Sequence, residues 1–563
     1  MMKKINFCLM ALAAAALSSC GKLGNLGADN FKVTPTPLEA IGGEVPATIN
    51  GTFPVKYMKK NAVVTVTPVL KYNGKEAVGQ SATFQGEKVE DNNASISYKL
   101  GGTYTMKTTF AYEDGMEQSD LYARFDAKLG KKKVSIPEVK IGYGVVTTSE
   151  LLSRCTGSAS TAQDAFQRVI EQKHEANIKF LIGQANIRTS ELSSVSIQDL
   201  VKILREINDM QEERALQGIE VSAYASPDGA YNINEKLAER RQDVSADYVR
   251  QQMKKAKVSG DVNVRYTAED WDGFQELVSK SNLQDKDLIL RVLSMYQDPE
   301  EREQQIRNMS SVYTEIASGI MPELRRARLM VNYEVIGRSD DQILEQYKAD
   351  PSKLSVDELL YGANELVEDD ATRKQWYQTT ARLYPNDYRA YNNLAKLALQ
   401  EGDESAAKAY LAKAKAVDSK APEANANMAL MALKDGDKQA AQAYMSQASG
   451  SDTFDDIMGQ LNIANGNYSA AASNLQKSKT NAAALAQILN KDYAAASRTL
   501  ANVQKPDATT SYLKAIVGAR TGDSGVVKSN LQAAISQDAS LGERAMKDLE
   551  FSNYRSVVEA LVK

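Results

Sequence analysis

Histidine and cysteine are the side chains best suited to nucleophilic and metal chemistry, and this chain has few of them. Its 563 residues include one histidine, His174, and three cysteines, Cys8, Cys20 and Cys155. A zinc site built from these residues needs several ligands, and a Ser-His-Asp triad would depend on His174 without a G-x-S-x-G turn to present the serine. Carboxylate-only catalysis, as in glycosidases, stays open because the chain has 72 acidic residues. We expect a non-enzymatic protein with no metal site and no cofactor.

The N-terminus predicts export followed by lipid attachment at Cys20. Lys3 and Lys4 precede the apolar residues 5–17, a run long enough for a signal sequence and too short to span a bilayer. The sequence Leu-Ser-Ser-Cys-Gly at 17–21 resembles a lipobox, in which cleavage before the cysteine leaves a diacylated N-terminus. Several acyl chains hold a protein stably to a membrane. We expect a signal peptide over 1–19 and a lipidated, glycine-containing tether over 20–30.

The residues after Cys20 predict which bacterial membrane holds the lipid anchor. Gly21 and Lys22 stand where the bacterial sorting pattern uses Asp to retain a lipoprotein at the inner membrane. The segment also lacks the acidic run that accompanies export to the cell surface in Bacteroidota. We therefore expect an outer-membrane lipoprotein that faces the periplasm.

Cys155 is the one cysteine left for other roles, because Cys8 lies in the signal sequence and Cys20 is acylated. No intramolecular disulfide is then expected, and a lone thiol is usually a buried small side chain. The charge balance of 68 basic and 72 acidic residues gives no reason to expect a nucleic-acid partner. The length allows about three or four domains.

Residues 31–145 have the pattern of an all-β domain. Alternation of inward and outward side chains marks a strand that carries Tyr104, Met106, Thr108, Phe110 and Tyr112 on one face. Residues 63–69 and 97–100 are also predicted strands, and Asn73-Gly74 and Asp114-Gly115 are predicted hairpin turns. We expect an immunoglobulin-like sandwich of about seven strands. A connector over 146–173 follows, with a helix near 162–172 and with His174 in a helix-like stretch.

The stretch 219–244, IEVSAYASPDGAYNINEKLAERRQDV, combines a strand, a glycine-containing loop and a polar helix. It resembles the signature of the OmpA-like C-terminal domain, a periplasmic module that binds peptidoglycan. The residues that match without a gap are Tyr224, Gly229, Asn234, Leu237 and Arg241. Ser226 stands where the family has its key Asp.

The resemblance implies a ligand site at Ser226, Asp228, Asn234 and Arg241. In the family, the Asp binds the ammonium of diaminopimelate and the Arg binds its carboxylate. Ser226 cannot neutralise an ammonium, and an unmatched, desolvated charge costs ~2–5 kcal/mol. Asp228 is either a replacement for the missing acid or a residue of the Pro227-Asp228-Gly229 turn. Arg241 is either a ligand residue or part of a structural ion pair.

The resemblance also implies a central α+β domain over 174–338 with the order β-α-β-α-β-β. Strands are expected near 178–181, 219–223, 262–266 and 329–335, and Arg325-Arg326 resembles the family's Asn-Arg-Arg before the last strand. Helical spacing of apolar residues predicts a helical insertion at about 271–321, where the family has a short connection.

Residues 339–563 are alanine-rich and repetitive. Helix-helix turns are predicted 25 to 34 residues apart, at Gly402, Gly436, Gly466, Lys491 and Gly522. A small residue follows each turn by five positions (Ala407, Ala441, Ala471, Ala496 and Val527) and a large apolar one by nine (Leu411, Met445, Leu475, Leu500 and Leu531). This pattern resembles the tetratricopeptide repeat and predicts an all-α solenoid, with residues 359–387 as a degenerate leading repeat.

The combination of lipid anchor, OmpA-like module and repeats resembles accessory lipoproteins of Bacteroidota envelope machines, such as those for type IX secretion or outer-membrane protein assembly. We expect a multidomain scaffold that binds envelope proteins. The alternative is an anchor that binds peptidoglycan and links the outer membrane to the wall. Ser226 favours the scaffold.

Overall fold

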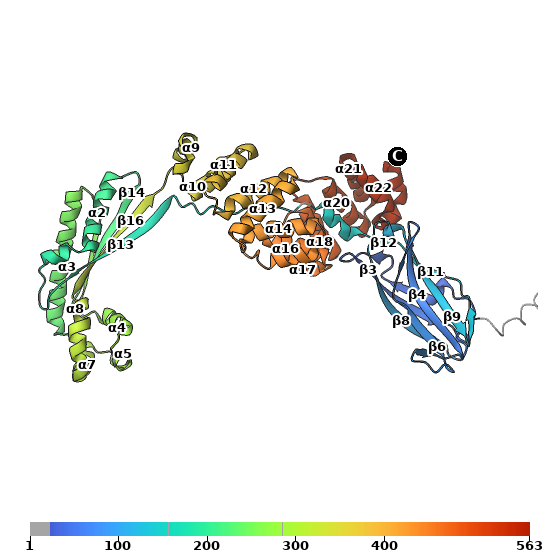
Figure 1. Cartoon of the computed structure of the whole chain (residues 1–563), viewed down its shortest axis with the longest axis horizontal. Coiled ribbons are helices and arrows are strands. Elements are labelled where there is room, and N and C mark those ends of the chain that lie inside the picture. Colours follow the sequence, from blue (N-terminus) through green and yellow to red (C-terminus); the bar gives the residue numbers. More distant parts are fainter. Residues whose placement is uncertain (1–22, 156, 284, 563) are drawn as a thin grey trace, which may run out of the picture. The chain divides into compact units, whose positions relative to one another are not determined.

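The computed structural model describes residues 23–562 except 156 and 284, and it divides into two compact units (Figure 1). Unit 1 is formed by Met1–Gln163 together with Tyr377–Lys563, and unit 2 is Asp164–Trp376. Unit 2 is therefore an insertion in the sequence of unit 1. Unit 1 combines an N-terminal β-rich region with a C-terminal all-helical repeat region that resembles tetratricopeptide solenoids.

The β-rich region consists of two packed sheets. The first contains β1 (Phe31–Thr34), β3 (Glu44–Phe53) and β8 (Gly102–Ala111) in the order β1-β3-β8. The second has the order β10-β9-β4-β6-β7, with β11 beside β9 and β5 beside β4; its strands are β4 (Ala62–Tyr72), β5 (Lys75–Val78), β6 (Ala82–Gly86), β7 (Ala94–Ile96), β9 (Asp120–Leu129), β10 (Lys132–Val134) and β11 (Val139–Tyr143). A short parallel pair joins β2 (Leu38–Glu39) to β12 (Val145–Val146).

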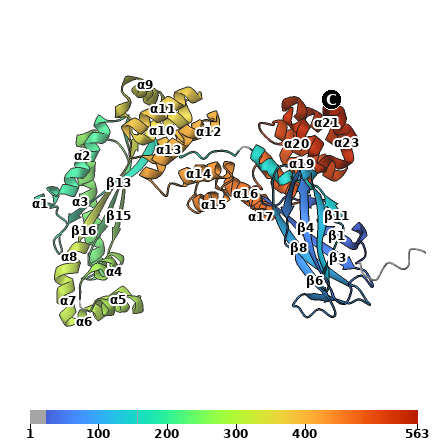
Figure 2. The same ribbon diagram turned by 45° about the vertical axis from the view of Figure 1, so that its right-hand side comes forward.

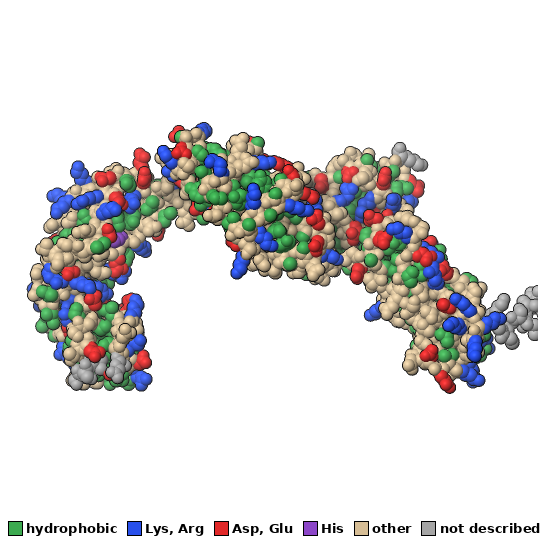
Figure 3. Space-filling model, viewed as in Figure 1, with side chains coloured by type: hydrophobic (Ala, Val, Ile, Leu, Met, Phe, Trp, Pro, Cys, Tyr) green, Lys and Arg blue, Asp and Glu red, His purple; other side chains and the backbone are tan. Residues whose placement is uncertain are grey.

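The sandwich core lies between the sheets because each strand buries alternate side chains. Val45 and Ile49 of β3 belong to the same buried cluster as Val64 and Val66 of β4. Leu23 and Leu26 also belong to this cluster. The short helix η1 (Ala28–Asn30) follows them in the sequence. The prediction of a tether up to residue 30 is thus wrong from residue 23 onward, because two leucines fix this segment to the sandwich. Charged side chains of both signs cover its visible face (Figure 3).

The predicted turns and strands of the sandwich have mixed outcomes. Asn73 and Gly74 form the tight turn between β4 and β5, both with positive φ. Residues 97–100 are a turn and not a strand, closed by the bond from Gly101 N to Ser97 O. Asp114-Gly115 is not a hairpin either, because β8 and β9 belong to different sheets and Gly115 precedes the helix η2 (Met116–Gln118).

Unit 2 is built on a four-stranded sheet in the order β13-β16-β14-β15. The strands are β13 (Val169–Lys179), β14 (Arg214–Tyr224), β15 (Val262–Thr267) and β16 (Arg326–Ile336), and only β14 and β15 pair in parallel. The helices α2 (Val195–Asp209) and α3 (Tyr231–Ala256) cover one face, where Leu200, Val221 and Leu329 are buried together.

A group of helices separates β15 from β16. It contains α4 (Trp271–Lys280), α5 (Lys286–Met295), α6 (Pro299–Asn308), α7 (Ser310–Glu315), the π-helix η4 (Ile316–Ile320) and α8 (Met321–Leu324). The helical character predicted for 271–321 is present. The group has its own apolar cluster, which includes Phe274, Ile289 and Leu324.

The helix predicted over 162–172 is wrong. Residues 162–168 form neither helix nor strand, and β13 begins at Val169, so His174 lies in a strand and its Nε2 contacts Ser196 O at 2.8 Å. Long-range partners decide this conformation. Residues 169–179 pair with β16, and the Phe166 ring packs against the Tyr361 ring at a tilt of 35°; these contacts override the local helix propensity.

The helical region begins inside unit 2 and continues through unit 1 (Figure 2). Unit 2 holds α9 (Asp340–Ala349), α10 (Val356–Tyr361), η6 (Gly362–Leu366) and the first half of α11 (Asp370–Leu383), and the second half of α11 belongs to unit 1. Unit 1 holds the pairs α12 (Tyr388–Glu401) and α13 (Glu404–Val417), α14 (Pro422–Lys434) and α15 (Lys438–Met445), α16 (Phe454–Ala464) and α17 (Tyr468–Asn474), α18 (Asn481–Leu489) and α19 (Tyr493–Ala501), α20 (Ala508–Thr521) and α21 (Ser524–Gln537), then α22 (Ser540–Lys547), η7 (Leu549–Tyr554) and α23 (Arg555–Val562).

The turn residues predicted from the repeats are confirmed. Gly402, Gly436, Gly466 and Gly522 have φ between 76° and 81°, a conformation that glycine adopts without strain. Lys491 holds the same position with φ 65°. The small and large residues five and nine positions after each turn are all buried between helices.

Candidate functional site

Ser226, Asp228 and Asn234 meet in the loop between β14 and α3. Ser226 Oγ donates to Asp228 Oδ1 at 2.6 Å. Asn234 Nδ2 donates to the carbonyls of Ser226 (3.1 Å) and Gly229 (2.9 Å), so the first turns of α3 fix the loop backbone. Ser226 and Asn234 are both buried. Three of the four predicted site residues therefore form one hydrogen-bonded group.

Arg325, at the end of the helical insertion, completes this group. Its Nη2 pairs with Asp228 Oδ2 at 2.7 Å, and its Nε donates to Ser226 Oγ at 3.1 Å. Arg307 of α6 donates to Asp228 O at 2.8 Å. Both carboxylate oxygens of Asp228 are thus engaged by the protein itself. We call Ser226, Asp228 and Arg325 the polar centre.

Arg241 lies nearby on α3, buried to 1 % exposure. Its guanidinium donates to three backbone carbonyls: Nε to Gln184 O (3.0 Å), Nη1 to Tyr224 O (2.9 Å) and Nη2 to Leu181 O (3.2 Å). It also lies over the Phe180 ring. Burial, with repulsion from Arg325, lowers the pKa of Arg241 to about 10, and Asp228 opposes this shift. Within the described chain Arg241 forms no ion pair with a carboxylate, so the structural ion pair that the sequence left open is not formed.

Sequence reasoning missed the role of Arg325 and Arg307. Arg325 was visible in the Arg325-Arg326 motif, but its partner Asp228 lies 97 residues earlier. Only the placement of β16 beside β14 brings the two together. No local pattern distinguished Arg307 from other helix-surface arginines.

A second arrangement lies in unit 1, where residues 157–163 run in extended form against the repeats. We call this segment the strap. Asn427 of α14 accepts from Ser160 N at 2.6 Å and donates to Ser160 O at 3.0 Å. Asn393 of α12 accepts from Ala162 N at 2.8 Å and donates to Ala162 O at 2.9 Å. Each asparagine therefore binds both backbone groups of one strap residue, as a neighbouring strand would.

The two asparagines occupy equivalent places, because each lies nine residues before the glycine turn of its repeat, Gly402 or Gly436. Asn392 also donates to Ser160 O, and it accepts from Asn427 Nδ2 at 2.9 Å. Ser160 and Ala162 are fully buried. Contacts between Ser160 and Asp452 and between Lys396 and Thr161 add side-chain recognition. Consecutive repeats thus recognise alternate residues of one extended peptide mainly through its backbone.

The sandwich is joined to the last repeats by the helix η3 (Thr148–Arg154) and its neighbours. Thr148 Oγ1 donates to Glu550 at 2.5 Å, and Arg544 donates to Thr147 O at 2.9 Å. Arg154 pairs with Asp538 at 2.7 Å. Within unit 1, the sandwich therefore contacts the last repeats, and the strap contacts α12 and α14.

Cys155 is buried at this junction, as expected for a lone structural thiol. Burial raises its pKa from 9.0 to about 12. The thiol is therefore neutral near pH 7, whereas the thiolate is the reactive form.

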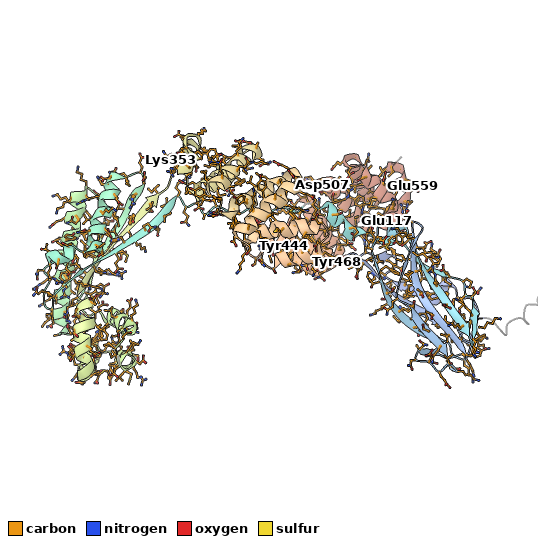
Figure 4. The ribbon with its side chains drawn as sticks, in the orientation of Figure 1. Glu117, Lys353, Tyr444, Tyr468, Asp507 and Glu559 are labelled. Carbon is orange, nitrogen blue, oxygen red and sulfur yellow. The ribbon has the colours of Figure 1, made fainter. Side chains whose placement is uncertain are left out.

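A cavity of about 30 Å³ lies between sandwich and repeats, beside Tyr468, Ser149 and Arg520. Tyr468 is labelled at this junction, with Glu117 on the sandwich side (Figure 4). The volume fits a water molecule.

Within the described residues, no helix combines the length and apolarity needed to cross a membrane. The same residues contain no group of three His, Cys, Asp or Glu side chains placed around a common metal position.

No family model matches the sequence, and no curated protein matches it. Solved structures similar to this chain include PilW, a widely conserved type IV pilus biogenesis factor (12 % identity, 36 % of this chain and 92 % of that one, TM-score 0.25). Others are the Cut9-Hcn1 hetero-tetramer of the APC/C (11 %, 65 % and 82 %, TM-score 0.29) and yeast Tom70 (10 %, 59 % and 75 %, TM-score 0.24). At TM-scores below 0.5, these similarities support no argument about what the chain does.

Proposed function

We propose that this chain is a non-enzymatic scaffold lipoprotein of the bacterial envelope. It is tethered to the outer membrane by acylated Cys20, faces the periplasm, and binds envelope proteins through its repeats and unit 2, as an accessory of a secretion or outer-membrane assembly machine. The observation that carries the proposal is the strap. The repeats hold an extended polypeptide through its backbone, which is how a repeat groove can bind a partner's segment.

Unit 2 is proposed as an OmpA-like module that has turned from wall binding to protein binding. The sheet order β13-β16-β14-β15, with two helices on one face, agrees with the β-α-β-α-β-β arrangement that the signature implied. Asp228 is the acid closest to the missing family position, and Arg325 already neutralises it. Arg241 is directed at three carbonyls of its own chain. A ligand with an ammonium and a carboxylate would have to displace both sets of contacts.

One observation favours the alternative, an anchor that binds peptidoglycan. Arg241 is a buried cation whose only described partners are neutral, and an uncompensated buried charge is costly. Two of its three carbonyl partners, Leu181 and Gln184, belong to an exposed loop that contains Gly183 with φ 64°. Movement of this loop would free Arg241 for the carboxylate of a wall peptide.

Co-sedimentation of residues 21–563 with purified sacculi separates the two functions. For the scaffold, we expect no sedimentation, or sedimentation that Arg241→Ala leaves unchanged. The anchor requires sedimentation that falls at least about tenfold in Arg241→Ala, as loss of a charge-assisted bond predicts. Arg250→Ala, which changes an exposed arginine of the same helix, is the matched control.

The lipid anchor and the partners need their own measurements. Labelled palmitate should enter the full chain and be absent from Cys20→Ser, which should also leave the membrane fraction. Cross-linking in intact envelopes, followed by purification of the full chain, should recover envelope proteins that a chain without unit 2 recovers less well. If the chain is acylated but cross-links to no protein, the scaffold function is contradicted, whereas the attachment of lipid to Cys20 is not.

A further inference from the structure

The end of the sandwich farthest from the repeats is formed by four connected loops, residues 54–61, 87–93, 97–101 and 130–133. The first loop is hydrogen-bonded to each of the others: Lys56 N to Tyr98 O, Lys88 N to Lys60 O, and Gly130 N to Asn61 O, at 2.7 to 2.9 Å. We call this surface the basic end. These bonds hold the backbones of the four loops together at one end of the sandwich.

The basic end concentrates positive charge. Its four loops contain eight lysines (Lys56, Lys59, Lys60, Lys88, Lys99, Lys131, Lys132 and Lys133) and three acids (Glu87, Glu90 and Asp91), although the whole chain has a net charge of −4. In the described chain, Lys133 alone of the eight forms an ion pair, a long one of 3.8 Å to Asp126. At the opposite end of the sandwich, residues 112–119 carry Glu113, Asp114 and Glu117 and no lysine or arginine. The lysine-rich loops of the basic end therefore differ in charge from residues 112–119, where Glu113 pairs with Lys75 of β5 at 2.9 Å.

The same surface exposes two large apolar side chains. Leu100 is 82 % exposed, the highest value among the large hydrophobic residues in the described chain, and Val55 is 59 % exposed. The bond from Lys56 to Tyr98 links their two loops. Both blue and red side chains are visible at this end of the sandwich (Figure 3). Apolar tips surrounded by lysines are suited to a surface that is anionic outside and apolar beneath.

The start of the described chain lies at this end. Leu23 is buried in the sandwich, and a Cβ on Gly24 would lie 3.8 Å from the ring of Tyr57, which belongs to the first loop. Cys20 is three residues before Leu23, and three residues span at most about 11 Å. A lipid on Cys20 would thus hold the membrane within about 11 Å of Leu23, at the same end of the sandwich as the lysines.

We propose that the basic end is a membrane-docking surface that binds the anionic headgroups of a phospholipid bilayer. The lysines contact the phosphates, and Leu100 and Val55 enter the headgroup layer. Orientation by Cys20 rests on the proposed function, whereas the affinity of the basic end for the bilayer does not. Docking would fix the angle of the sandwich on the membrane, which an acyl anchor alone leaves free.

Flotation of unacylated residues 21–563 with vesicles tests this surface. The vesicles contain phosphatidylethanolamine and phosphatidylglycerol at about three to one, or neutral phosphatidylcholine. We expect flotation with the anionic vesicles only, decreasing as salt shortens the range of the attraction. The triple variant Lys131→Glu, Lys132→Glu and Lys133→Glu should bind at least about tenfold more weakly, and Leu100→Ser should bind more weakly at every salt concentration.

The matched control changes three exposed lysines of the repeats, Lys477→Glu, Lys479→Glu and Lys528→Glu, and should float like the wild type. The proposal is overturned if the wild type does not float, if it floats equally with neutral vesicles, or if both triple variants lose binding equally. Should the glutamates prevent folding, as judged by circular dichroism, glutamines at 131–133 replace them. Because the chain carries no lipid, failure here leaves acylation of Cys20 to be decided by palmitate labelling.

Discussion

At the residue scale, the ion pair between Asp228 and Arg325 dominates the polar centre. Both side chains are largely buried, at 14 % and 10 % exposure. Removing one member of such a pair leaves the other charge buried without compensation. The candidate ligand residue Asp228 is therefore also a stabilising residue of unit 2.

We expect Arg325→Ala to lower the free energy of unfolding of unit 2 by about 3 kcal/mol. Both tryptophans of the chain, Trp271 and Trp376, lie in unit 2, so urea unfolding followed by tryptophan fluorescence reports on this unit. Arg250→Ala is the control, because its pair with Asp247 is exposed and should change stability by less than about 1 kcal/mol. Equal effects of the two variants would show that the pair is not buried in solution.

Cys155 gives a second prediction. With its pKa raised from 9.0 to about 12 by burial, the thiol should resist iodoacetamide at pH 8.5 in the folded chain and react after denaturation. The unfolded chain releases this proton first, so the contribution of Cys155 to stability falls as the pH rises from about 9 toward about 12. Ser153→Cys in a Cys155→Ala background is the exposed control and should react without denaturant.

At the element scale, the repeat turns allow a matched comparison. Gly402 and Gly466 both have φ 77°, so replacing either by alanine incurs the left-handed cost of about 1–2 kcal/mol. A Cβ at 402 meets nothing within 4 Å, whereas a Cβ at 466 would lie 2.6 Å from Ile41 of the sandwich. We expect Gly466→Ala to destabilise unit 1 by about 1–3 kcal/mol more than Gly402→Ala, because the contact is overpacked. Equal midpoints of thermal unfolding for the two variants would mean that the sandwich does not pack against the turn at Gly466.

Lys491 is the non-glycine residue at this repeat position, with φ 65°. Lys491→Gly should therefore stabilise unit 1 by about 1 kcal/mol through relief of backbone strain. Lys491→Ala keeps the strain while removing the same side chain, so it should give no gain. Calorimetry of the three chains measures the difference, and a gain in both variants would assign the effect to the side chain.

At the scale of the whole molecule, unit 2 is an insertion between the strap and the first repeat of unit 1. Replacing Asp164–Trp376 by a flexible Gly-Ser linker should leave unit 1 folded, because its contacts from Thr148 to Glu550 and from Ser160 to Asn427 lie within it. The measurement is protection of Cys155 from iodoacetamide in the shortened chain. Rapid alkylation would show that unit 1 depends on unit 2.

The sequence predicted those features whose signal is local. The turns at Gly402 and Gly436 and the alternation along β8 follow from spacing within a few residues, and the structure has them. The strap did not follow, because residues near Ala162 favour a helix locally and are held extended by asparagines 231 to 267 positions away. Arg325 was found as part of a motif, but its role depends on a partner in another element. Long-range hydrogen bonds therefore account for the main errors.

The contact of η3 with the last repeats also affects the order in which the chain can mature. A polypeptide is synthesised from its N-terminus, so Thr148 and Arg154 are made long before their partners Glu550 and Asp538. The sandwich can form early, but the residues of η3 that contact the last repeats stay uncovered until almost all of the chain has been made. A chain that stops early would thus contain a folded sandwich whose contact residues for the last repeats, Thr148 and Arg154, lack their partners.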